Sequence, residues 1–144
     1  MTWESDDMKG VRWGVVTMAV LAAACTPDLE DRTSAANGAA LFAQNCAACH
    51  GAQGQGYDGP ARDWTPPPDL TLLSQRNGGV FPEIEALATI FGSADHTNPE
   101  GRAMPEFGAG DLGPTVVVEV EEGIGTPIPA DLVALSEYLR SIQR

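Results

Sequence analysis

Two cysteines and a histidine, Cys46, Cys49 and His50, stand close together in the first half of the chain. On a helix, positions i, i+3 and i+4 share one face, so the two sulfur atoms and the imidazole can meet one edge of a flat ligand. We therefore expect these three residues to lie on one helical turn and to contact the same ligand.

This spacing is typical of covalent haem attachment through thioether bonds, with the histidine bound to iron. Two other interpretations are a redox-active dithiol and half of a zinc site. A zinc site needs further Cys or His ligands, and apart from His50 the remaining candidate is His96. A redox-active dithiol of the thioredoxin type stands near a βαβ pattern, and the sequence has no such pattern. We expect one haem c, held by Cys46 and Cys49, with His50 as the proximal iron ligand.

The N-terminal residues 1–24 have the features of an exported leader. Residues 13–24 are uncharged and mostly apolar, follow Lys9 and Arg12, and end in three alanines. This stretch is too short to cross a bilayer as a helix, which takes about 20 residues. The acidic residues 1–7 do not suit a leader, so we expect translation to start at Met8.

The residues before Cys25 resemble a bacterial lipoprotein signal, although Leu21 stands one position further from the cysteine than is usual. The resemblance implies a lipid on Cys25, which would anchor the protein on the periplasmic side of a bacterial membrane. The alternatives are a plain cleaved leader and an uncleaved anchor. Residues 25–32 would form a flexible tether, and residues 33–144 one compact domain.

The charge is strongly acidic. Beyond residue 25 the chain has six Arg, no Lys and 17 acidic residues, a net charge of −11. Such a surface repels phosphate backbones, so nucleic-acid binding is excluded, and it favours a partner with a basic docking patch. The alternative is that the acidity only maintains solubility. A domain this small, with 16 Gly and 11 Pro, buries a modest core, which a large apolar cofactor would enlarge.

Hydrophobic periodicity predicts three main helices, over residues 34–49, 82–91 and 131–143. Their apolar faces are Gly38, Leu41 and Phe42 in the first, Ile84, Leu87, Ala88 and Phe91 in the second, and Leu132, Leu135, Leu139 and Ile142 in the last. Glycine inside a helix costs up to about 1 kcal/mol relative to alanine, so close packing by another element is expected at Gly38.

The order of these elements, with the attachment site at the end of the first helix, resembles the class I c-type cytochromes over residues 33–144. The resemblance implies an all-α fold of three main helices around one haem. In this family the first and last helices cross with a small residue against an aromatic one, and Gly38 and Tyr138 occupy the matching places. The glycine-rich residues 51–60 match the family's loop after the haem histidine.

The same resemblance implies two further contacts with the haem and its histidine. A proline carbonyl, from Pro66, Pro67 or Pro68, would accept the second ring proton of the histidine. Residues 102–107 resemble the family's distal-ligand loop, in which Met precedes Pro.

Beyond the leader, Met104 is the only methionine of the chain. The resemblance of its segment to the family's distal-ligand loop, after the middle helix, implies that it is the distal iron ligand in preference to a gap-filler in the core. His96, in a polar loop, is the rival, and its ligation would lower the reduction potential.

Residues 108–128 form a longer connection than the fold needs. Val116, Val118 and Val120 alternate with Val117, Glu119 and Glu121, which predicts a short, half-buried β-hairpin within residues 114–128, near the Met104 side. It is either a surface insertion or a lid or docking edge for one partner.

Iron closed by His50 and Met104 would have no open position, so we predict a one-electron carrier between periplasmic redox partners rather than an enzyme. The sequence shows no acid–base pair, nucleophile triad or phosphate-binding loop. One alternative is a fixed haem subunit of a dehydrogenase or oxidoreductase complex. Another is a gas-binding sensor, if Met104 is labile.

Overall fold

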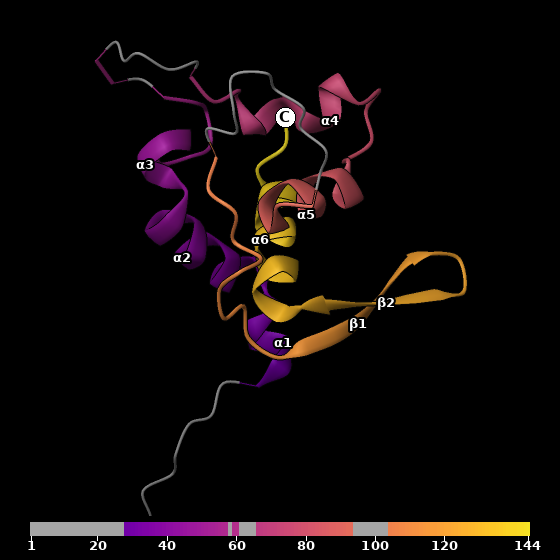
Figure 1. Cartoon of the computed structure of the whole chain (residues 1–144). Helices are drawn as coiled ribbons and strands as arrows, with labels where there is room; N and C mark the ends of the chain where they lie inside the picture. Colours follow the sequence, from indigo (N-terminus) through magenta and orange to yellow (C-terminus); the bar gives the residue numbers. More distant parts are fainter. Residues whose placement is uncertain (1–27, 58, 61–65, 94–103) are drawn as a thin grey trace, which may run out of the picture.

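The computed structural model describes residues 28–57, 59–60, 66–93 and 104–144. The fold is mostly helical and carries one two-stranded antiparallel sheet, as predicted (Figure 1). In chain order the elements are α1 (Leu29–Arg32), α2 (Ala35–Asn45), α3 (Ala47–His50), the 3-10 turn η1 (Leu70–Leu72), α4 (Leu73–Arg76), α5 (Glu83–Phe91), β1 (Thr115–Glu121), β2 (Ile124–Pro129) and α6 (Ala130–Ser141).

The centre of the fold is the packing of α2 against α6. A Cβ atom on Gly38 would overlap the carbonyl oxygen of Ala134 and lie 2.9 Å from the Cβ atom of Tyr138. The rings of Phe42 and Tyr138 pack with their centroids 5.1 Å apart. The predicted packing of a small residue, Gly38, against the aromatic residue Tyr138 is therefore confirmed. Glycine is required at position 38 because the backbones of α2 and α6 are in contact there.

The predicted inward face of α5 is confirmed at Leu87 and wrong at its two ends, Ile84 and Phe91. Leu87 and Ile90 are buried against α6, whereas Ile84 is 54% exposed and Phe91 is 40% exposed. Ile84 and Phe91 instead line an open groove of about 260 Å³ between α5 and β2. The bounds of α5 are confirmed, since Pro82 precedes its first residue and Gly92 caps its end with a φ of 101°.

The predicted hairpin is present as β1 and β2, and it projects from the helices on the side away from α3 (Figure 1). Val116 and Val118 are half-buried while Val117 is 76% exposed, so the alternation expected of a half-buried strand holds here. The pairing register of the two strands shifts between Glu119 and Glu121, where the ladder is irregular.

Two boundaries differ from the prediction. The helix expected over residues 34–49 is divided at Cys46 into α2 and α3. Residues 29–32, the end of the expected tether, form the single turn α1, so helical structure begins before residue 33. Within the part of the chain that the structure describes, no helix is long and apolar enough to cross a membrane. The leader and Cys25 lie outside the described residues.

Candidate functional site

Cys46, Cys49 and His50 lie on one helical turn, as their spacing predicts. Cys46 closes α2 by donating its N–H to the carbonyl of Phe42 at 2.8 Å. Its own carbonyl then accepts from the N–H groups of Cys49, at 3.1 Å, and His50, at 2.9 Å. Cys46 is half-buried against the hydrophobic core and Cys49 is exposed. This turn therefore faces the core at one cysteine and solvent at the other.

Burial sets the chemistry of these groups. It lowers the pKa of the His50 imidazole, which favours the neutral ring. Burial, with a smaller contribution from Cys49, raises the pKa of Cys46 to about 11. Among the described residues His50 Nδ1 is buried without a hydrogen-bond partner. The turn thus presents a protonated thiol at Cys46 and a neutral imidazole nitrogen.

The segment after His50 is a tight glycine-rich turn. Gly51 has a φ of 75°, and a side chain there would overlap the carbonyl oxygen of Gly56. The N–H of Gly56 donates to the carbonyl of His50 at 2.9 Å. The carbonyl oxygen of Pro67 lies 3.3 Å from the Cβ position of Gly56. The expected bond from His50 to one of the three prolines is not present among the described contacts, but the Pro67 carbonyl packs against the turn that follows His50.

A polar cluster holds this proline segment to the C-terminal end of the chain. Arg144 donates from Nη2 to Asp69 Oδ2 at 2.8 Å and from Nε to Thr71 Oγ1 at 2.7 Å. Gln143 donates to the carbonyl of Leu70 at 2.9 Å and accepts from the N–H of Ser74 at 2.9 Å. Sequence reasoning missed this cluster, because its members are some 70 positions apart and no periodicity links them.

The carboxylate of Asp69 is the acid of this cluster. Its hydrogen bond from the Thr71 hydroxyl, supported by the Thr71 N–H and the Arg144 guanidinium, holds its pKa below the ordinary value of 3.8. A carboxyl whose pKa is lowered by folding stabilises the folded state above its unfolded pKa, and that contribution disappears as the pH falls through the folded pKa.

We expect Asp69→Asn to lower the melting temperature at pH 7, with a difference from wild type that shrinks as the pH falls below about 4. Thermal unfolding followed by circular dichroism across this pH range checks it. Asp28→Asn, which removes an exposed acid at the start of α1, is the control for a general charge effect. A difference that stays constant from pH 7 to pH 3 would contradict the assignment.

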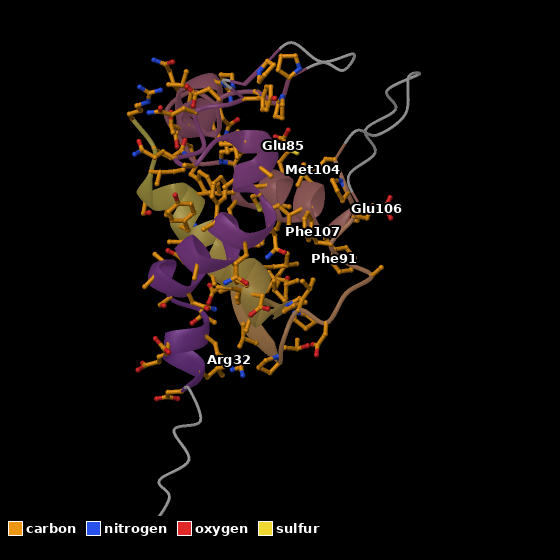
Figure 2. All side chains as sticks on the ribbon, turned by 90° about the vertical axis from the view of Figure 1, so that its left-hand side faces the viewer. Arg32, Glu85, Phe91, Met104, Glu106 and Phe107 are labelled. Carbon is orange, nitrogen blue, oxygen red and sulfur yellow. The ribbon has the colours of Figure 1, made fainter. Side chains whose placement is uncertain are left out.

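Met104 lies on the irregular segment before the hairpin. It is half-buried and packs against the same hydrophobic core as Cys46. In Figure 2 it lies beside α5, above Phe107 and Phe91, while Glu106 points outward. The structure thus brings Met104 and the attachment turn to one core. The rival ligand His96 lies outside the described residues.

The donor atoms of Cys46, Cys49, His50 and Met104 suit an iron porphyrin. The described residues supply two thiols, a neutral imidazole whose Nδ1 is buried and a thioether, and the Cys46 thiol and the Met104 thioether pack against the apolar core. Thiols form the covalent bonds, and imidazole and thioether are iron ligands of cytochromes c. No group of three or more His, Cys, Asp or Glu placed to hold a metal ion occurs among the described residues.

The family model of the cytochrome c oxidase, cbb3-type, subunit III matches residues 33–120. No curated protein and no solved structure matches the chain. The matched residues include α2, the attachment turn, α5, the Met104 segment and most of β1.

Proposed function

Because the chain belongs to the cytochrome c family described as cytochrome c oxidase, cbb3-type, subunit III, we propose that it is a one-electron carrier with a single haem c ligated by His50 and Met104. The family match establishes a c-type cytochrome with covalently bound haem c and electron transfer as its function, in a family whose domains are typically extracytoplasmic. The proposal is carried by the turn from Cys46 to His50, which presents two thiols and an imidazole with a buried Nδ1, and which packs against the core at Cys46.

Each residue of the site has a distinct role in this proposal. Cys46 and Cys49 hold the haem covalently, so the cofactor stays bound in both redox states. His50 binds iron through one nitrogen, and its other nitrogen would donate to a backbone carbonyl of Pro66, Pro67 or Pro68, of which the Pro67 carbonyl lies against the turn after His50. Met104 fills the second axial position and raises the reduction potential. Haem, when bound, supplies the reversible Fe(II)/Fe(III) couple.

The acidic surface supports a proposal about partners. With a net charge of −12, the chain would dock to basic patches on its electron donor and acceptor. Contacts of this kind are brief, and they weaken as salt screens the charges. A lipid on Cys25 would keep the domain at the periplasmic face of a bacterial membrane and restrict it to partners there.

A second candidate function is favoured by the family description, which names a subunit of a cytochrome c oxidase. In that case the chain would be a fixed haem subunit that passes electrons to a catalytic partner. Purification in mild detergent separates the two. A stoichiometric partner subunit that survives high salt supports the fixed subunit, and a monomeric haem protein supports the carrier.

We expect Met104→Ala to abolish the weak red charge-transfer band that sulfur-ligated ferric haem shows, and to lower the reduction potential, because a thioether ligand is lost. Optical spectra of the oxidised protein and a redox titration check both. Leu112→Ala is the matched control, since Leu112 also packs half-buried on the core just after this segment. It should keep the band.

The outcomes of this experiment are distinct. A wild-type protein without the band would remove Met104 as a ligand and bring His96 or an open site forward. If the reduced wild type then binds carbon monoxide readily, the gas-binding alternative replaces the carrier. Haem content per chain, measured after alkaline pyridine treatment, should be one.

A further inference from the structure

The segment that carries Met104 is tied to the last turn of α5. The N–H of Phe107 donates to the carbonyl of Ile90 at 3.2 Å, and the N–H of Gly108 donates to the carbonyl of Phe91 at 2.9 Å. The last carbonyls of a helix have no partner within the helix. The two bonds therefore satisfy the end of α5 and fix the backbone of residues 107–108 to it.

This attachment is possible only because glycine stands at position 108. A Cβ atom there would overlap the carbonyl oxygen of Phe91 and lie 2.8 Å from two carbon atoms of its ring. The oxygen is backbone and cannot rotate away. The ring of Phe91, which is 40% exposed, lies against the same position. Any larger residue at position 108 would therefore lift the segment off α5.

We propose that Gly108, by letting its segment close on the end of α5, is a positioning residue that sets where Met104 meets the haem iron. Three residues separate Gly108 from Met104, too few for the chain to absorb a displaced anchor. Met104 and Phe107 both pack on the core that α5 and α6 share, so the anchor fixes the ligand relative to that core. This inference rests on Met104 being the distal ligand.

The test is Gly108→Ala against Gly110→Ala. Gly110 lies two residues further on, and a Cβ there meets only the Phe107 carbonyl oxygen, at an ordinary 3.4 Å. We expect Gly108→Ala to weaken the red charge-transfer band of the oxidised protein and to bind added imidazole with a dissociation constant about tenfold lower, because the iron position is open more often. Gly110→Ala should match wild type in both.

Phe91→Ala is the second variant, for the case that Gly108→Ala does not fold. It removes the ring that lies against Gly108 and leaves the backbone carbonyl at position 91 in place, so we expect a smaller increase in imidazole affinity. Far-ultraviolet circular dichroism and covalent haem content should stay at the wild-type level in both folded variants.

If both variants keep the band intensity and the imidazole affinity of the wild type, the inference is wrong. That result differs from a failure of the proposed ligation, which wild type and Met104→Ala reveal by themselves.

Discussion

Replacement of Gly38 by alanine is expected to lower the free energy of unfolding by about 3 kcal/mol, because the added methyl group enters a closed contact between backbones. Its Cβ atom would overlap the carbonyl oxygen of Ala134, which cannot move without displacing α6. Leu135 and Leu139 of α6 are each 5% exposed, and they lose packing if the helices separate. Chemical denaturation of the haem-loaded protein, followed by circular dichroism, measures the loss.

The direction of this effect is what makes the test informative. Helix propensity alone would make Gly38→Ala stabilising by up to about 1 kcal/mol. Ala40→Gly, at an exposed position of the same helix, isolates that propensity and should cost about 1 kcal/mol. If Gly38→Ala is as stable as wild type or more stable, α2 and α6 do not cross at Gly38, and the packing described here is wrong.

The features that could be predicted from the sequence are those set by neighbouring residues. The spacing of Cys46, Cys49 and His50 gives one turn because helical hydrogen bonds connect positions four apart. Gly92 ends α5 because glycine readily adopts the left-handed conformation found there. The alternation at Val116 to Glu119 predicts a strand for the same local reason, and the hairpin follows.

The features that could not be predicted depend on which distant surfaces meet. The apolar stripe of α5 that includes Ile84 matches a helical period as well as the face with Ile90 does, and only the position of α6 selects between them. The bond between Asp69 and Arg144 joins residues 75 positions apart. The anchor of the Met104 segment uses backbone N–H groups, which leave no mark on the sequence.

The double variant Cys46→Ala, Cys49→Ala is expected to contain no covalent haem, since the described residues hold no other free cysteine. Haem stain after denaturing electrophoresis should be present for the wild type and absent for the double variant. Its helicity should fall as well. The buried core among the described residues is small, so the helices would lose the apolar contacts that a bound haem adds to it. Helicity measured by circular dichroism at equal protein concentration checks this second effect.

Cys25→Ser is the control that separates attachment of haem from attachment of lipid. It removes the third cysteine of the chain and should leave the haem stain unchanged. On the proposal that Cys25 carries a lipid, it should also release the protein from the membrane fraction. Variants with only Cys46 or only Cys49 replaced should each retain one thioether bond, so haem survives denaturation at reduced yield.

If the double variant still holds covalent haem, the attachment turn is elsewhere. If wild type carries zinc in place of haem, the two cysteines and His50 form half of a structural metal site, and the rest must come from residues such as His96.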